Sequence, residues 1–362
     1  MTKCSSSTQR RRLRGRNTKD RKKGIIITTE QRFHNMKVIA DIIEKTLSNW
    51  NMDYKEKGDA LFALAKESND DSIIYRCVSL AKEEYERARL DGDTQCLCNL
   101  AHCYFVLAHY DNSREYYQKS IELHIEGSRN KNYQAHDFYR YYRVNNVRQA
   151  KSILKYIMLS SPSKFNDPVD CPIVQGPNVE YLFPDKTVFE GLKVCCFGED
   201  DIRKNRDNHY HLDAKNWAYY GDSHRGICIR YHFFPNQLEK RLANKFVFKK
   251  VDYRENFSFE RGIVADGLLR KSNYYEEENE WRIVWYDKNF SENKYYKAKK
   301  DCLLIPINIC NIIAIYVGYR CPNEIAKTVV EFAKKKKSVP LPVYKIHPDP
   351  KNLFRMTETR LN

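Results

Sequence analysis

Residues 276–285 carry the sequence EEENEWRIVW. Four carboxylates fall within its first five residues, and an aromatic and β-branched run typical of a strand follows. Side chains two apart on a strand point the same way, so we expect Glu278 and Glu280 on one face and Trp281 on the other. Such a strand can form the wall of a polar cleft and stay anchored in a core. An acidic turn leading into an ordinary edge strand is the alternative.

The composition is that of a large globular chain. Its 362 residues and 43.1 kDa exceed the usual size of one domain, so we expect two domains. No apolar run approaches the roughly 18 residues that cross a bilayer, and the basic N-terminus lacks the apolar segment of a secretory signal. We therefore expect a cytoplasmic protein without membrane contact, or a nuclear one if the host is a eukaryote.

The net charge of +16 is concentrated at the N-terminus. Residues 1–24 hold ten Lys or Arg against a single acidic residue, Asp20, and we predict that residues 1–30 form a basic tail that is disordered. A basic arm of this kind binds phosphate polymers weakly and without sequence preference, which predicts weak nucleic-acid contact. A solubilising tail without a partner is the alternative.

The 12 cysteines are scattered along the chain, and we expect them to be free thiols that are mostly buried. Zinc sites of the double CxxC type are missing from the sequence. His209 and His211 could supply two metal ligands if they lay on one strand, but a complete ligand set is lacking. The sequence therefore predicts no metal site.

Residues 31–126 show helical spacing and are predicted to form an all-helical domain. Ala81, Tyr85 and Ala88 recur 32 residues later, in the form Ser113, Tyr117 and Ser120. This spacing resembles tetratricopeptide repeats, in which small and large residues alternate so that paired helices pack closely. The grooves of such repeats usually hold a peptide, so the resemblance implies a peptide or protein partner. A plain helical bundle is the alternative.

The pattern changes to short strands after residue 138. Residues 127–135 are polar and without periodicity, and we place the domain boundary there. Residues 138–348 are predicted to form a mixed α+β domain with a central sheet, and residues 349–362 a C-terminal tail. Strands are predicted at 138–144, 156–160, 193–197, 249–253, 311–318 and 343–346, and helices at 146–155, 259–269 and 324–335.

Polar residues at the starts and ends of these strands form the candidate site, and we expect them to converge on one cleft. The candidate catalytic residues are Glu278, Glu280 and His224. The candidate ligand-binding residues are Tyr139, Arg140, Asn166, Asp167, Trp217, Tyr220 and Arg282.

Several short motifs, in this order, resemble one family. They are Tyr139-Arg140-Tyr141, Phe165-Asn166-Asp167-Pro168 with Asp170, Cys196-Phe197 with Glu199, Trp217 with Tyr220, His224, Gly226, Cys228 and Ile229, Glu278-Asn279-Glu280-Trp281-Arg282, and Val317-Gly318. Together they are similar to the mostly prokaryotic domain of unknown function 2971 family, over about residues 138–346. Gly198 departs from the pattern, because the family usually has a serine there, and so does Asn216, where methionine is common.

The order of an early Arg, a middle hydroxyl- and His-bearing segment and a late Glu-x-Glu strand is similar to that of ADP-ribosyltransferases. The likeness implies NAD as the bound nucleotide, clamped by Arg140 or His224. It also implies that Glu280 offsets the positive charge that develops at the anomeric carbon. A nuclease or another hydrolase of nucleic acids or nucleotides, and a non-catalytic sensor or binding module, are the alternatives.

The two carboxylates give this hypothesis a simple test. Like charges so close together repel each other, which raises the pKa of one of them. If the pair serves function and not packing, we expect Glu280→Gln to abolish activity and to leave stability nearly unchanged.

Overall fold

The computed structural model describes residues 43, 48, 51–128, 137–165, 170–171, 185–200, 209–233, 235–242, 245–256, 262–289, 296–298, 301–307, 310–335 and 341–362. The basic tail, most of the predicted boundary segment 127–135 and the candidate residues Asn166 and Asp167 lie outside these ranges.

Four helices make up the described N-terminal region: α2 (Tyr54–Glu67), α3 (Asp71–Leu90), α4 (Leu97–Asp111) and α5 (Arg114–Gly127). The first turns of α2, α3 and α5 are capped by side chains, whereas α4 begins without a side-chain cap. Asp53 and Glu56 form a reciprocal capping box before α2, and the Ser113 side chain accepts from the Tyr116 N–H at the start of α5.

Small residues let these helices pack in pairs. A Cβ atom on Gly58 in α2 would lie 2.6 Å from the ring of Tyr85 in α3, so this pair approaches closely because Gly58 has no side chain. In the second pair, the Ser120 hydroxyl of α5 donates to the Ala101 carbonyl of α4 at 2.7 Å. Of the six residues in the 32-residue pattern, all are buried except Ser113, which caps α5.

The rest of the described chain is mixed α+β, with a large central mixed sheet. The strands are β1 (Asp137–Tyr142), β2 (Tyr156–Ser160), β3 (Leu192–Gly198), β4 (Ile227–Phe233), β5 (Phe246–Lys250), β6 (Asp252–Arg254), β7 (Arg270–Ser272), β8 (Glu280–Tyr286), β9 (Lys297–Ala298), β10 (Cys302–Pro306), β11 (Cys310–Val317), β12 (Val343–Asp349) and β13 (Asn352–Arg360). The helices are α6 (Val147–Ile153), α9 (Ala214–Tyr219), α10 (Pro235–Leu242) and α11 (Asn323–Lys334).

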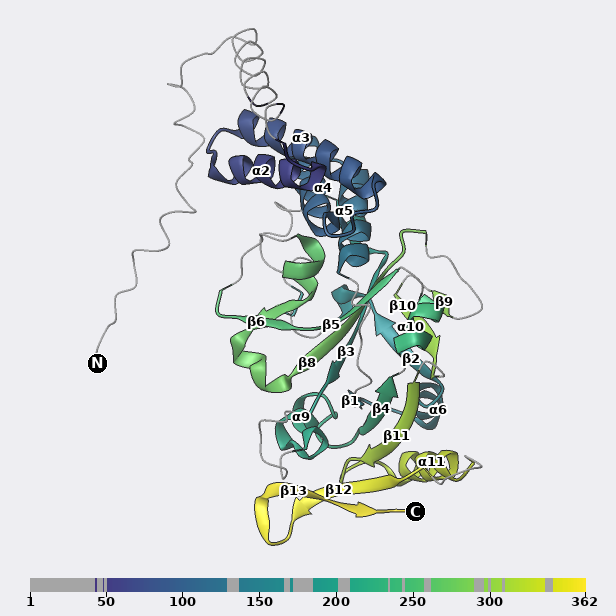
Figure 1. The fold of residues 1–362 in the computed structure, drawn as a ribbon. Helices are drawn as coiled ribbons and strands as arrows, with labels where there is room; N and C mark the ends of the chain where they lie inside the picture. Colours follow the sequence, from purple (N-terminus) through teal and green to yellow (C-terminus); the bar gives the residue numbers. More distant parts are fainter. Residues whose placement is uncertain are drawn as a thin grey trace, which may run out of the picture.

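Eleven of the described strands form one sheet. Its main path runs β13-β12-β11-β4-β1-β3-β2-β10-β9, and β8 joins it by pairing with β3 and β5. All described pairs in this sheet are antiparallel except β11 with β12, and β6 and β7 form a separate parallel pair. In Figure 1 the helices α2 to α5 lie at one end of the sheet and β12 and β13 at the other.

The sheet splits along one edge of β3. This strand pairs with β8 over its whole length, from Leu192 to Gly198. On its other edge, β2 meets it at Val194 and β1 meets it at Gly198. β1 and β2 therefore diverge along the same edge of β3, and a gap opens in the sheet between them.

Apolar clusters cover both faces of this sheet, and two of them extend over β3 and β8. One contains Phe138, Cys195 and Ile283, which belong to β1, β3 and β8. The other contains Val194 and Val284 from the opposite face, and it extends to residues of α4 and α5 such as Phe105, Tyr117, Ile121 and Ile125. The helical region and the α+β region thus share an apolar core, and their division into separate domains stays a prediction.

Several predicted elements differ from the structure in their bounds or type. Residues 352–360, predicted to lie in a C-terminal tail, form β13 and pair antiparallel with β12. The predicted helix 259–269 is, in its described part, a π-helix, η5 (Ile263–Leu268), and the predicted strand 249–253 is divided between β5 and β6. Among the described helices, none has the length and apolar character that a membrane span requires.

Candidate functional site

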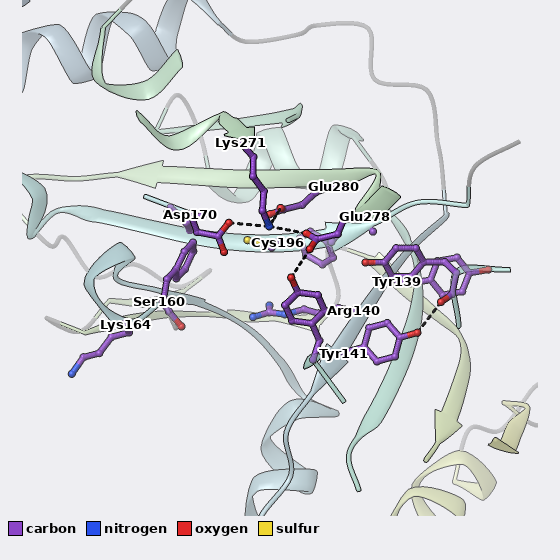
Figure 2. A pocket seen from close by; sticks show the side chains of 16 residues that line it. Tyr139, Arg140, Tyr141, Ser160, Lys164, Asp170, Cys196, Lys271, Glu278 and Glu280 are labelled. Atoms are coloured by element: carbon purple, nitrogen blue, oxygen red, sulfur yellow. Dashed lines mark hydrogen bonds and ion pairs between the residues drawn. The ribbon is translucent and has the colours of Figure 1, made fainter. Parts of the chain in front are cut away.

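A cavity of about 220 Å³ opens on the sheet where β1 and β2 diverge (Figure 2). Its lining comes from β1, β3, β7, the start of β8, the end of β2, and the 3₁₀-helices η2 (Pro162–Lys164), η4 (Tyr210–Leu212) and η6 (Asn273–Glu278). The lining residues are Tyr139, Arg140, Tyr141, Ser160, Lys164, Phe165, Asp170, Val194, Cys196, Phe197, Gly198, Tyr210, Tyr220, Lys271, Glu278 and Glu280.

Lys271 is the centre of the charged side of this cavity. Its ammonium group lies 2.7 Å from a Glu278 oxygen, 2.9 Å from Asp170 and 3.4 Å from Glu280 (Figure 2). Burial by itself lowers the pKa of Lys271, but the carboxylates of Glu280 and Asp170 outweigh it and hold the pKa above its ordinary value. Lys271 is therefore a permanent cation that joins three carboxylates.

Glu280 is neutralised from two sides. The Arg282 guanidinium donates to both of its oxygens, at 2.6 and 3.1 Å, and Arg282 is fully buried. Burial raises the pKa of Glu280, but Arg282 and then Lys271 outweigh it and lower the pKa to about 2. Arg282 also donates to the backbone carbonyls of Leu268 and Asp170, at 2.9 and 3.1 Å. Arg282 is thus a supporting residue behind the cavity wall.

Glu278 has a different environment from Glu280. The Tyr220 hydroxyl donates to one of its oxygens at 2.6 Å and Lys271 to the other. Its side chain is 8% exposed, and burial is the main reason that its pKa is raised above the ordinary value. Glu278 and Glu280 therefore share Lys271 but differ in how well their negative charge is compensated.

The prediction that Glu278 and Glu280 lie on one strand is wrong. Glu278 ends the 3₁₀-helix η6, and β8 begins only at Glu280. Between them, Asn279 has a φ of 44°, a left-handed conformation that asparagine tolerates better than most residues. The Asn279 side chain also donates to the Glu199 carbonyl at 3.0 Å. The two carboxylates approach the same lysine because the chain turns here, and not because of strand alternation.

Tyrosines form the opposite side of the cavity. The Tyr139 hydroxyl donates to Asp200 at 2.8 Å, and the Tyr141 hydroxyl donates to the Tyr210 backbone carbonyl at 2.7 Å. The Tyr139 and Tyr210 rings stack with their centroids 5.7 Å apart. This side offers flat apolar surfaces with hydroxyl groups at their edges.

Arg140 lines the cavity but leaves β1 on the other face of the sheet from Tyr139 and Tyr141. Its guanidinium donates to the Met158 carbonyl at 2.9 Å and contacts the Cys195 sulfur. It lies 4.9 Å from the ring centroid of Tyr142. Arg140 forms no ion pair among the described residues, so no carboxylate there compensates the charge of this lining residue.

Trp217 and His224 do not line the cavity. Trp217 is fully buried and donates its ring N–H to the His211 carbonyl at 2.7 Å, so it supports the fold behind Tyr141. His224 has a φ of 67° in the turn before β4, and its ring stacks on Trp217. Burial, followed by the charge of Arg320, lowers its pKa. The structure thus brings together Tyr139, Arg140, Tyr220, Glu278 and Glu280, and leaves these two outside.

Eleven of the 16 lining residues are not among the sequence candidates, and Lys271, Asp170 and Tyr210 are the most important of these. The short strand of Lys271 gives no polar pattern. Asp170 belongs to a quoted motif but is not among the candidates, and Tyr210 lies between the two histidines that the sequence offers as metal ligands. Asn166 and Asp167 lie outside the described residues, although Phe165 and Asp170 on either side line the cavity.

The described residues contain no group of three or more His, Cys, Asp or Glu arranged to hold a metal ion. Comparison with family models, curated proteins and solved structures gives no match for this chain. The resemblances stated above are therefore carried by their motif residues, and the function must be argued from the cavity itself.

Proposed function

We propose that the cavity is an active site that binds a ribose-bearing nucleotide and breaks its glycosidic bond, with NAD as the substrate. This is the chemistry of ADP-ribosyltransferases and of NAD glycohydrolases. The observation that carries the proposal is the position of Glu278, a buried carboxylate at the wall of a tyrosine-lined cavity, held by Tyr220 and Lys271.

Glu278 is better suited than Glu280 to face the reacting carbon. Breaking a glycosidic bond places positive charge on the anomeric carbon, and a fixed carboxylate stabilises that charge. The lowered pKa of Glu280 means that Arg282 and Lys271 already compensate its charge. The raised pKa of Glu278 means that its surroundings compensate it incompletely, so its charge is available to a ligand. We assign Glu278 the reacting position and Glu280 a supporting one.

The remaining lining residues fit a nucleotide in their charges and shapes. The tyrosine rings offer stacking surfaces for a flat base or a sugar. Arg140 and the exposed Lys164 supply positive charge for phosphate groups. A cavity of about 220 Å³ matches a nucleoside-sized part of NAD better than the whole dinucleotide, so the rest of the ligand would extend through its mouth.

Labelled NAD tests the proposal with one matched pair of variants. Glu278→Gln removes the charge and keeps the shape, and we expect NAD turnover to fall by about 100-fold or more. Glu276→Gln changes an exposed carboxylate on the same 3₁₀-helix and should leave turnover unchanged. NAD should also raise the melting temperature of the wild type.

The products separate the possible activities. Label transferred to protein or nucleic acid indicates a transferase, and free ADP-ribose indicates a glycohydrolase. Cleavage of nucleic acid without NAD turnover would favour the nuclease alternative. No thermal shift with any nucleotide and no turnover would overturn the proposal. A non-catalytic binding module would then be favoured, since Lys271 and Arg282 already pair internally with all three carboxylates.

We further propose that α2 to α5 are two tetratricopeptide-like hairpins that bind a peptide or protein partner. The close pairs Gly58 with Tyr85 and Ala101 with Ser120 support this, because such repeats require small residues at helix crossings. A photo-crosslinking residue at the exposed Leu64 should capture the partner, whereas one at Tyr274 near the cavity should not. An experimental structure in which α4 and α5 do not superpose on such a hairpin would contradict the assignment.

For the basic tail we propose weak contact with nucleic acid. Deleting residues 1–24 should flatten the salt dependence of binding to any nucleic acid. Unchanged binding after the deletion would place the contact elsewhere on the protein.

A further inference from the structure

Gly198 and Tyr210 both line the cavity, and the ring of Tyr210 lies where a side chain at position 198 would be. A Cβ atom on Gly198 would lie 1.8 Å from the Tyr210 Cζ atom and 2.3 Å from its hydroxyl oxygen. No atoms approach so closely without a bond, so any side chain at position 198 must displace the ring. Glycine is therefore required here by the close approach of Tyr210 to the strand.

The rest of Tyr210 is fixed by its neighbours. Its backbone N–H donates to Asp200 at 2.7 Å, and its carbonyl accepts from the Tyr141 hydroxyl at 2.7 Å. Its ring stacks on Tyr139. The position of the phenol group is thus set from three sides before any ligand arrives.

The Tyr210 hydroxyl itself forms no hydrogen bond within the described residues, although the residue lines the cavity. Burial, followed by the charges of Glu278 and Glu280, raises the pKa of Tyr210. The phenol therefore stays protonated and keeps a proton to donate. The Tyr210 hydroxyl is thus a fixed donor close to two carboxylates, and it is free to donate a hydrogen bond to a ligand in the cavity.

We propose that Tyr210 is a ligand-binding residue whose hydroxyl, together with the Glu278 carboxylate, recognises the vicinal diol of a ribose. One sugar hydroxyl donates to Glu278, and its neighbour accepts from Tyr210. This inference deepens the proposed function, since it names the part of the nucleotide that the cavity recognises.

Calorimetric binding of ADP-ribose tests the inference without relying on turnover. Tyr210→Phe removes only the hydroxyl, and we expect binding to weaken about tenfold. Tyr274→Phe removes a hydroxyl from an exposed tyrosine that does not line the cavity, and binding should not change. Wild-type affinity in Tyr210→Phe would overturn the inference, whether or not NAD is turned over.

The shared space allows a second test, in which the hydroxyl is moved from one residue to the other. Gly198→Ala should displace the ring and weaken binding at least as much as Tyr210→Phe. In the double variant Gly198→Ser with Tyr210→Ala, the serine places a hydroxyl one bond beyond Cβ, close to the position of the lost phenol oxygen. We expect it to bind ADP-ribose more tightly than Gly198→Ala with Tyr210→Ala.

The results distinguish the failure of the sugar site from the failure of the enzyme. Weakened ADP-ribose binding in Tyr210→Phe without any NAD turnover would support the sugar site and count against the enzyme. NAD turnover that is unaffected by Tyr210→Phe would do the reverse. Wild-type ADP-ribose binding in Gly198→Ala would contradict the displacement of the Tyr210 ring. Equal binding of the two double variants would mean that a serine hydroxyl at position 198 does not replace the Tyr210 hydroxyl. Urea unfolding of each variant shows that the protein compared is folded.

Discussion

The two sides of the cavity are held together by different forces. On the charged side, Lys271, Arg282, Asp170, Glu278 and Glu280 are bonded to one another over 2.6–3.4 Å, and little of any of them is exposed. On the tyrosine side, rings pack against rings, and the hydroxyls of Tyr139 and Tyr141 each bond to a single neighbour. A buried charge depends on its partners, whereas a buried ring depends on contact area. The charged side should therefore be much more sensitive to the loss of one group.

Removing the central lysine should have the largest effect. Lys271→Met leaves Asp170 and Glu280 paired with Arg282 and leaves Glu278 without a described cation, so we expect the free energy of unfolding to fall by about 4 kcal/mol. Lys249→Met is the control, because this lysine is exposed on β5 opposite Arg282 and its loss should change stability by less than about 0.5 kcal/mol. Urea unfolding measures both. Equal stability of the two variants would show that the charged side does not depend on mutual compensation.

Glu280→Gln tests the charged side through the pH dependence of protein stability. The structure changes the earlier expectation that this substitution is nearly neutral, because Glu280 accepts two bonds from buried Arg282. Its folded pKa of about 2 lies below the ordinary value of 4.5, so the charge stabilises the fold above pH 4.5 and this contribution is lost as the pH falls towards 2. We expect a loss on the order of 3 kcal/mol at neutral pH, shrinking over that window.

The contribution of Glu278 to stability should depend on pH in the opposite direction to that of Glu280. The folded pKa of Glu278 is raised, so its contribution to stability is present below pH 4.5 and is lost as the pH rises through the folded value. At neutral pH, Glu278→Gln should therefore be as stable as the wild type or slightly more stable, although it loses turnover. Unfolding curves of both glutamine variants between pH 2 and 7 provide the comparison. Parallel pH profiles would mean that the two carboxylates are equivalent.

The sequence predicted elements better than it predicted contacts. The strand 156–160 and the helix 324–335 follow from local patterns and are found with the same or nearly the same bounds. Tyr220, Glu278 and Glu280 were selected because acidic and aromatic residues cluster beside a strand. Lys271 was missed because its carboxylate partners come from two separate segments, and only the folded chain shows that they meet.

His224 lies apart from the cavity for an equally physical reason. Asp222, Ser223 and His224 all have positive φ, so the polar loop before β4 consists of turn residues, and none of the three lines the cavity. Gly198 was noted only as a departure from the family's usual serine, because the sequence does not show that the ring of Tyr210 lies where that side chain would be.

Among the variants expected to lose stability, the smallest loss should come from the tyrosine side. Tyr141→Phe removes the hydroxyl that donates to the Tyr210 carbonyl and leaves the ring contact with Trp217 in place. We expect the free energy of unfolding to fall by about 1 kcal/mol, because the carbonyl loses one neutral hydrogen bond. ADP-ribose binding should weaken slightly and less than in Tyr210→Phe, since Asp200 and Tyr139 still hold Tyr210. A stability loss as large as that of Lys271→Met would show that both sides of the cavity depend on polar bonds to the same degree.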